Sequence, residues 1–178
     1  MNRGGQVGLD GMMVAAIALG SNLASGRGDR EANLRAAIER VGALGAVSAV
    51  SSFYDTEPVG YLAQPRFLNG ALLLETPLQP LELMRGLLAV EQAMGRNRVG
   101  AVAKGPRVID LDLLLYGQAV MDSEELTLPH PAMAEREFVL RPLAEIAPEM
   151  RHPVLGATVA ELLDRLMRPP LRLQPTSC

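Results

Sequence analysis

The fold is decided by residues 107–116, which read RVIDLDLLLY and have the apolar character of a central β-strand. Within this stretch Asp110 and Asp112 alternate with Leu111 and Leu113. Side chains two residues apart on a strand project from the same face, so the two carboxylates share one face, with their Cα atoms about 6.6 Å apart. We therefore expect the opposite, leucine face to pack on the hydrophobic core.

Upstream of this strand, apolar or alternating runs predict three further strands, at 13–19, 46–54 and 66–75. Two helices are expected between them, one capped by Asp29 and one that begins at Pro80. Downstream, the sequence predicts a short hairpin and a last helix that begins with a capping box at its N-terminus. The order is thus β, α, β, β, α, β, which predicts a ferredoxin-like α+β sandwich.

The domain is expected to span residues 12–167. The Gly-rich and polar segment 1–11 and the Pro-rich segment 168–178 are expected to be flexible tails. The capping box Thr158-Val159-Ala160-Glu161 places the last helix inside this domain, and Pro169 ends it.

Composition is that of an ordinary globular protein, with 48% hydrophobic and 21% charged residues. The net charge of −3 argues against a general affinity for nucleic acid or anionic lipid, because such binding needs an excess of cations. The single cysteine, Cys178, excludes an intrachain disulfide, and no apolar run approaches the roughly 18 residues of a membrane span. We expect a cytoplasmic protein, and its protein partners are unknown from the sequence.

Basic residues crowd the loop GRNRVGAVAKGPR (95–107), which contains Arg96, Arg98, Lys104 and Arg107. Cations beside the aspartate pair predict bound phosphate, with a hard divalent cation such as Mg²⁺ on the carboxylates. A solvated outer face of an edge strand and a basic solvated loop also fit the spacing. No Walker A loop and no G-x-G-x-x-G fingerprint occurs, so metal and arginines are expected to hold any nucleotide.

Two further positions have both a functional and a plainer interpretation. Glu91 lies at the edge of the apolar stripe of the second helix. It either accepts a hydrogen bond from a nucleotide hydroxyl or amine, or it faces solvent and pairs with another side chain of its helix. His130 stands between two prolines with Arg136 nearby, which favours a phosphate contact, although a lone histidine is more often structural. His152 has no comparable neighbours, and we assign it no role.

Asn69 interrupts an otherwise apolar strand. Its amide has both a donor and an acceptor, which suits the edge of a heteroaromatic ring. Phe67 and Phe138 would stack on the faces of such a ring, with ordinary core packing as the alternative for both.

Taken together, these motifs resemble the 6-hydroxymethyl-7,8-dihydropterin pyrophosphokinase family of folate biosynthesis. The similar stretches, in chain order, are AIALGSNL (16–23), SSFYDTEPVG (51–60), FLNGALLLET (67–76), GRNR (95–98), GPRVIDLDLLLYG (105–117) and LTLPHPAMAEREFVLRPLAEIAP (126–148). The resemblance implies a ferredoxin-like α/β/α sandwich with a central, mainly antiparallel sheet, in which ATP and the pterin meet beside the central strands. The reaction it implies is transfer of the β,γ-pyrophosphoryl group of ATP to the pterin hydroxymethyl oxygen, which releases AMP.

The resemblance also implies roles for individual residues. Asp110 and Asp112 would hold two Mg²⁺ ions and act in catalysis with Arg96 and Arg107. The nucleotide-binding positions would be Glu91, Arg96, Arg98, Arg107, Leu113, Thr127, His130 and Arg136. Asn69 would hydrogen-bond the pterin edge, and Phe67 and Phe138 would enclose the ring. Backbone contacts to the pterin would come from Thr56, Pro58 and Val59.

This chain departs from the family pattern in the basic loop. Ala103 and Lys104 stand where many members have a basic and then an aromatic residue, so we expect an altered closing step. The short length predicts that no second folate enzyme is fused to this domain. Two other functions remain open on the sequence: another Mg²⁺-dependent phosphoryl or nucleotidyl transferase, and a non-catalytic ferredoxin-like binding module. The sparse aromatics and negative charge disfavour an RNA-binding module.

Overall fold

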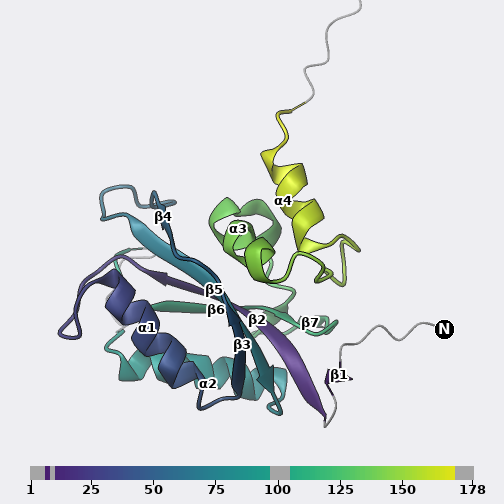
Figure 1. Ribbon diagram of the computed structural model, residues 1–178, viewed down its shortest axis with the longest axis horizontal. Helices are drawn as coiled ribbons and strands as arrows, with labels where there is room; N and C mark the ends of the chain where they lie inside the picture. The colour runs from purple at the N-terminus through teal and green to yellow at the C-terminus, as the bar shows by residue number, and fades with distance from the viewer. Residues whose placement is uncertain (1–6, 9–10, 97–104, 171–178) are drawn as a thin grey trace, which may run out of the picture.

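The computed structural model describes residues 7–8, 11–96 and 105–170, with helices on both faces of one sheet (Figure 1). The strands are β1 (Val7–Gly8), β2 (Met12–Ser21), β3 (Ala46–Val50), β4 (Tyr54–Thr56), β5 (Phe67–Thr76), β6 (Asp110–Tyr116), β7 (Met121–Asp122) and β8 (Thr127–Leu128). The helices are α1 (Arg30–Val41), α2 (Pro80–Ala93), α3 (Glu137–Ile146) and α4 (Val159–Met167), with a 3₁₀ turn η1 (Met133–Glu135). None of the helices in these ranges is long and apolar enough to cross a membrane.

The main sheet is antiparallel, with its four principal strands in the order β6-β2-β5-β3. Each β-α-β unit is therefore split by a strand of the other unit, which is the predicted ferredoxin-like topology. The short strand β4 also pairs with β5, and β7 and β8 form the expected hairpin. Strand β1 lies inside the segment expected as an N-terminal tail, and it pairs with β2. The outer limits of the domain stay a prediction.

Two predicted strands have different bounds in the structure. The strand expected over 46–54 is divided into β3 and β4, because Ser51 turns inward and its Oγ accepts from the backbone N–H of Ala71 at 2.9 Å. The strand expected from 107 begins at Asp110, and before it the backbone N–H of Arg107 donates to the side chain of Asn22 instead of to a backbone carbonyl. At both places a side-chain oxygen accepts from a backbone N–H in place of a backbone carbonyl, while one backbone–backbone bond remains.

The predicted helix caps are confirmed. The carboxylate of Asp29 accepts from the backbone N–H of Ala32 at 2.9 Å, and Thr158 Oγ1 accepts from the backbone N–H of Glu161 at 3.2 Å. Helix α2 begins at Pro80, as expected. These contacts satisfy N–H groups that the first helical turn leaves without a partner.

The sheet separates two hydrophobic cores. Ile17 of β2 and Leu111 and Leu113 of β6 pack beneath α1 and α2, which confirms the predicted leucine face. Ala16 belongs to the core beneath α3 and α4, because successive residues of a strand point to opposite faces. The aspartates of β6 therefore lie on the face that carries α3 and α4, near the end of β6 where the strand begins.

Candidate active site

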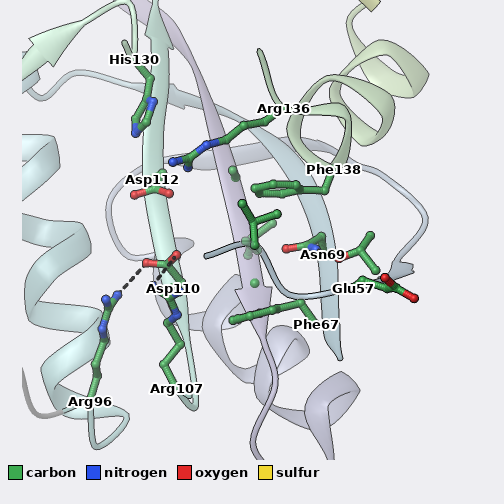
Figure 2. Close-up of a pocket in the computed structure, with 15 residues that line it drawn as sticks. Glu57, Phe67, Asn69, Arg96, Arg107, Asp110, Asp112, His130, Arg136 and Phe138 are labelled. Carbon is green, nitrogen blue, oxygen red and sulfur yellow. Dashed lines mark hydrogen bonds and ion pairs between the residues drawn. The ribbon is translucent and has the colours of Figure 1, made fainter. Parts of the chain in front are cut away.

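A cleft of about 280 Å³ lies on this face of the sheet, at the end from which α3 starts (Figure 2). Strands β2, β5 and β6 form its floor, and the segment after β4 and the start of α3 form its sides. The lining residues are Ala18, Leu19, Gly20, Thr56, Glu57, Val59, Phe67, Asn69, Arg96, Arg107, Asp110, Asp112, His130, Arg136 and Phe138.

On the floor of the cleft, β2 contributes Gly20, a position without a side chain. Gly20 lies opposite Asn69 of β5 on one side and opposite Asp110 of β6 on the other. A Cβ atom on Gly20 would lie 2.9 Å from Asn69 Oδ1. The absence of a side chain at this position therefore leaves room for a ligand between the amide and the carboxylate.

Asp110 forms an ion pair with an arginine on each side. Its Oδ1 lies 2.6 Å from Arg96 Nη1, and its Oδ2 lies 3.4 Å from Arg107 Nη1. Burial lowers the pKa of the Arg96 guanidinium, but Asp110 and Glu91 outweigh this effect, and the pKa is raised overall. Arg96 is therefore a fixed positive charge at the edge of the cleft.

Asp112 has no ion pair among the described residues. Burial, together with repulsion from Asp110 and Glu91, raises the pKa of Asp112 from 3.8 to about 7. A desolvated carboxylate beside a second carboxylate on the same strand face has the donor chemistry that a hard divalent cation requires. Asp110 and Asp112 therefore fit a Mg²⁺ site, although the described residues contain no cluster of three or more such ligands.

Cationic groups surround the acidic pair. The Arg107 guanidinium lies 5.1 Å from the centre of the Phe67 ring, and its buried Nε has no hydrogen-bond partner. The Arg136 guanidinium lies 5.7 Å from the centre of the Phe138 ring. An unpaired buried donor and guanidinium groups held over aromatic rings suit an anionic ligand.

His130 is oriented by the backbone of the turn that follows it. Its Nδ1 accepts from the backbone N–H of Ala132 at 3.2 Å, so the proton of the neutral ring is assigned to Nε2. Burial and the nearby Arg136 lower the pKa of His130. In the ligand-free protein His130 is therefore a neutral hydrogen-bond donor.

An aromatic slot forms the other half of the cleft. Figure 2 shows Phe67 and Phe138 on opposite sides of a gap, with Asn69 between them. The Asn69 Nδ2 donates to Thr56 Oγ1, which ties β5 to β4. This arrangement can hold a flat heterocycle between two rings with an amide at its edge.

Glu91 lies behind the cleft and does not line it. It is 1% exposed, pairs with Arg96 and accepts from the backbone N–H of Leu111 at 3.1 Å. The solvent-facing alternative for this residue is therefore wrong. A direct contact between Glu91 and a nucleotide stays a prediction.

The structure brings most of the predicted site residues together. Those that line the cleft are Arg96, Arg107, Asp110, Asp112, His130, Arg136, Thr56, Val59, Phe67, Asn69 and Phe138. Those that do not line it are Pro58, Glu91, Leu113 and Thr127. Leu113 is 5% exposed and belongs to the core beneath α1 and α2, and Thr127 lies in β8. Arg98, Ala103 and Lys104 lie outside the described residues.

The sequence prediction did not include Ala18, Leu19 and Gly20 as site residues. The Gly-Ser-Asn turn after the first strand is a signal that could have found them. The sequence does not show that Gly20 lies between Asn69 and Asp110, because this depends on strand register. His152 has a structural role, because its Nδ1 accepts from the backbone N–H groups of Val154 and Leu155.

Comparison with known proteins decides the family. Residues 16–148 match the model of 7,8-dihydro-6-hydroxymethylpterin-pyrophosphokinase (HPPK). The chain belongs to this family. The activity of the HPPK family is pyrophosphoryl transfer in folate biosynthesis. The resemblance that the motifs indicated is therefore confirmed.

Bacterial HPPK relatives match the chain over most of their own length. The 2-amino-4-hydroxy-6-hydroxymethyldihydropteridine pyrophosphokinase of Pseudomonas aeruginosa is 46% identical over 147 residues, which are 83% of this chain and 88% of that protein. The protein of the same name from Bacillus subtilis is 44% identical over 146 residues, 81% of this chain and 84% of the relative. The chain is also 40% identical to the Folic acid synthesis protein fol1 of Schizosaccharomyces pombe over 162 residues, but spans 21% of that longer protein.

Solved structures support the HPPK fold. A crystal structure of Plasmodium falciparum HPPK-DHPS with pteroate has a TM-score of 0.67 and 14% sequence identity. The match covers 86% of this chain and 44% of that chain. At this identity the likeness shows the fold, and it confirms the ferredoxin-like sandwich predicted from the sequence.

Proposed function

We propose that the chain transfers the β,γ-pyrophosphoryl group of ATP to the hydroxymethyl oxygen of 6-hydroxymethyl-7,8-dihydropterin, which gives the pterin diphosphate and AMP. One observation carries the proposal: a single cleft contains an acidic pair, a group of arginines and an aromatic slot with an amide at its edge. The first two features suit a metal-bound triphosphate, and the third suits a pterin. Both substrates would therefore meet in one cavity.

The phosphate side of the cleft supplies positive charge without a protein nucleophile. Arg96 and Arg107 would neutralise charge that develops on the phosphate oxygens during transfer. Arg136 and the Nε2 proton of His130 would bind the outer phosphate oxygens from the opposite side. Such positioning and charge compensation are the main requirements of phosphoryl-transfer chemistry, so no covalent enzyme intermediate is needed.

Asp110 and Asp112 would hold two Mg²⁺ ions, which would supply positive charge to offset the charge of the ATP phosphates. The protein contributes the two carboxylates on one strand face. Arg96 and Arg107 fix the orientation of Asp110 from both sides. Asp112 stays available for a cation because the described residues form no ion pair with it.

The pterin side would orient the acceptor. Phe67 and Phe138 would enclose the ring, and Asn69 would hydrogen-bond its edge. Thr56 would hold the Asn69 amide in place through their hydrogen bond. The hydroxymethyl group would then face the phosphate side, because the slot and the acidic pair share the floor at Gly20.

The proposal is tested by AMP release from ATP, Mg²⁺ and 6-hydroxymethyl-7,8-dihydropterin, resolved by chromatography. We expect AMP only when the pterin is present, and a loss of at least about 100-fold in Asp110→Ala. The matched control is Asp122→Ala, an exposed aspartate in β7, which should keep full activity. Pterin-independent transfer to another alcohol would favour a different transferase, and no transfer by a folded protein that binds ATP would contradict the proposal.

Gly20→Val is expected to weaken pterin binding by at least about 10-fold, because the added side chain would displace the Asn69 amide and fill the cleft floor. The measurement is the pterin dissociation constant, by calorimetry, together with the unfolding temperature. Displacing the Asn69 amide would also break its hydrogen bond to Thr56, so we expect a modest loss of stability as well. Unchanged pterin affinity would show that the ring does not occupy the space above Gly20.

A further inference from the structure

The side chain of Asn22, directly after β2, joins segments that lie far apart in the sequence. Its Nδ2 donates to the carbonyl oxygen of Pro65 at 3.0 Å and to Oε1 of Gln64 at 2.9 Å. Its Oδ1 accepts from the backbone N–H of Arg107 at 2.8 Å, and its backbone N–H donates to the carbonyl oxygen of Arg107 at 3.1 Å. Asn22 itself is only 2% exposed, whereas Pro65 is exposed and Arg107 is partly buried.

The chemistry of the partners requires an amide at this position. A backbone N–H can only donate and a backbone carbonyl can only accept, so the orientation of the Asn22 amide is fixed by Arg107 and Pro65. A carboxylate would lack the donor for Pro65, and alanine would leave both backbone groups unpaired. Arg107 is partly buried, so its backbone N–H is costly to leave without an acceptor, and few other side chains satisfy both groups.

Both segments that Asn22 joins carry residues of the cleft. Pro65 precedes Phe67, the first residue of β5, by two positions. The Arg107 guanidinium lies over the Phe67 ring at 5.1 Å, and its Nη1 is 3.4 Å from Asp110 Oδ2. The side chains of Phe67 and Arg107 therefore meet in the cleft, while Asn22 connects the backbones that carry them.

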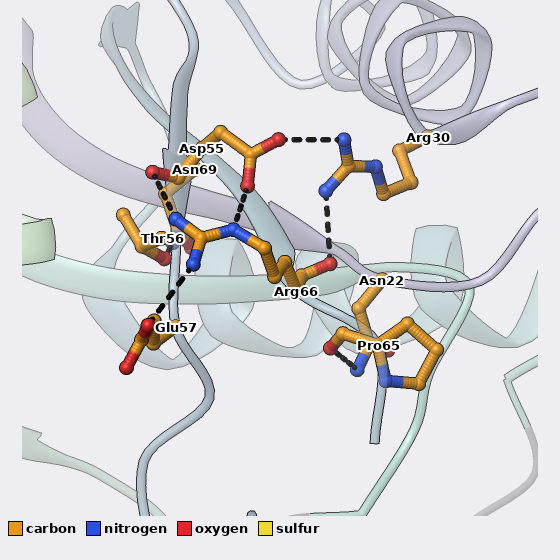
Figure 3. Close-up of polar contacts among 8 residues, drawn as sticks. All are labelled: Asn22, Arg30, Asp55, Thr56, Glu57, Pro65, Arg66 and Asn69. Atoms are coloured by element: carbon orange, nitrogen blue, oxygen red, sulfur yellow. Dashed lines mark hydrogen bonds and ion pairs between the residues drawn. The ribbon is translucent and has the colours of Figure 1, made fainter.

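A second group of contacts holds the segment before β5 from its exposed side (Figure 3). Arg30 Nη1 donates to the carbonyl oxygen of Arg66 at 2.9 Å, and Asp55 accepts from Arg30 and from Arg66. The Arg66 and Asp55 side chains are 50% and 48% exposed, and exposed ion pairs contribute little to stability. The Asn22 contacts differ from this group because Asn22 itself is buried and also reaches Arg107.

We propose that Asn22 is a positioning residue that keeps Phe67, on the ring-binding side of the cleft, aligned with Arg107, on the phosphate-binding side. This inference rests on the proposed function, because it assigns the two sides to the two substrates. Loss of the Asn22 amide would let the segments move relative to one another. Both pterin binding and turnover would then suffer, although Asn22 itself does not line the cleft.

The test compares Asn22→Ala with a matched variant, Asn33→Ala. Asn33 is also fully buried, but its side chain bonds to Leu23 and Ser25, outside the cleft. The readouts are kcat, KM for the pterin and the unfolding temperature, all with Mg²⁺ and ATP at saturation. For Asn22→Ala we expect KM for the pterin to rise and kcat to fall by at least about 10-fold each, since small misplacements are costly in catalysis.

In Asn33→Ala the unfolding temperature should fall while both kinetic constants stay within about 2-fold of the wild type. Asn22→Asp gives a second test, because it keeps an acceptor for the Arg107 N–H and loses the donor to Pro65. We expect Asn22→Asp to raise KM for the pterin with a smaller loss of kcat than in Asn22→Ala. If Asn22→Ala does not fold, Asn22→Asp is compared with Asn33→Ala in the same way.

A purely structural role would appear as a lower unfolding temperature with unchanged kcat and KM in the Asn22 variants, and this result would overturn the inference. Failure of the proposed function is a different outcome. In that case the wild-type protein itself would release no AMP in the presence of the pterin.

Discussion

Replacing Asp112 by asparagine is expected to reduce pyrophosphoryl transfer by at least about 100-fold and, at the same time, to stabilise the ligand-free protein. Asp112 is largely buried, and burial together with Asp110 and Glu91 raises its pKa to about 7. Its charge is therefore unfavourable for folding near neutral pH in the absence of a cation. Asparagine keeps the shape of the side chain but removes this charge, and its amide oxygen is a weaker ligand for a divalent cation.

The stabilisation should depend on pH. The native carboxyl keeps its proton up to about pH 7, whereas the unfolded one releases it near its ordinary value of 3.8. The native state thus binds more protons in this range, so the free energy of unfolding of the wild type falls as pH rises from about 4 to 7 and stays lower above that. The advantage of Asp112→Asn should therefore be larger at pH 8 than at pH 5.

The magnitude follows from about 1.4 kcal/mol per pKa unit, reduced because the asparagine amide must also be desolvated. We expect a gain of about 1 to 2 kcal/mol at pH 8, or an unfolding temperature about 2 to 8 °C higher. Thermal unfolding without Mg²⁺, at both pH values, measures this, with the exposed Asp122→Asn as control. A less stable Asp112→Asn variant would show that the native fold requires the carboxylate itself.

The sequence predicted the faces of strands better than the contacts between them. Alternation within 107–116 correctly placed Leu111 and Leu113 on the core and the aspartates on the opposite face. The floor at Gly20 could not be predicted in this way, because its neighbours Asn69 and Asp110 come from two other strands. Their register depends on tertiary pairing, which a period of two residues does not specify.

The polar residues that support the site were also difficult to predict. Helix periodicity placed Glu91 at the edge of an apolar stripe, a position that fits both exposure and burial. Glu91 can be buried because Arg96, from the loop that follows α2, pairs with its carboxylate. Asn22 likewise has its partners at Pro65 and Arg107, far along the chain, so the amide alone gave no signal for its contacts.

Glu91→Ala is expected to destabilise the protein by about 3 kcal/mol, because it removes one of the two carboxylates that pair with Arg96 and leaves the buried backbone N–H of Leu111 without its acceptor. Glu91 is 1% exposed, pairs with Arg96 and accepts from the backbone N–H of Leu111. For a chain of this size the unfolding temperature should fall by roughly 10 °C. Thermal unfolding measures this, with Glu39→Ala, an exposed glutamate on α1, as the matched control.

The same variant should reduce kcat by at least about 10-fold under conditions where it remains folded, because Arg96 would keep only Asp110 as a counter-charge. Without the attraction of Glu91, the Arg96 guanidinium would pair with Asp110 only and would shift from its wild-type position. Glu91→Gln separates the two effects, since it keeps an acceptor for the Leu111 N–H but not the charge. We expect Glu91→Gln to recover part of the stability and little of the turnover. If Glu91→Ala unfolds at the same temperature as Glu39→Ala, the pair of Glu91 and Arg96 does not stabilise the fold.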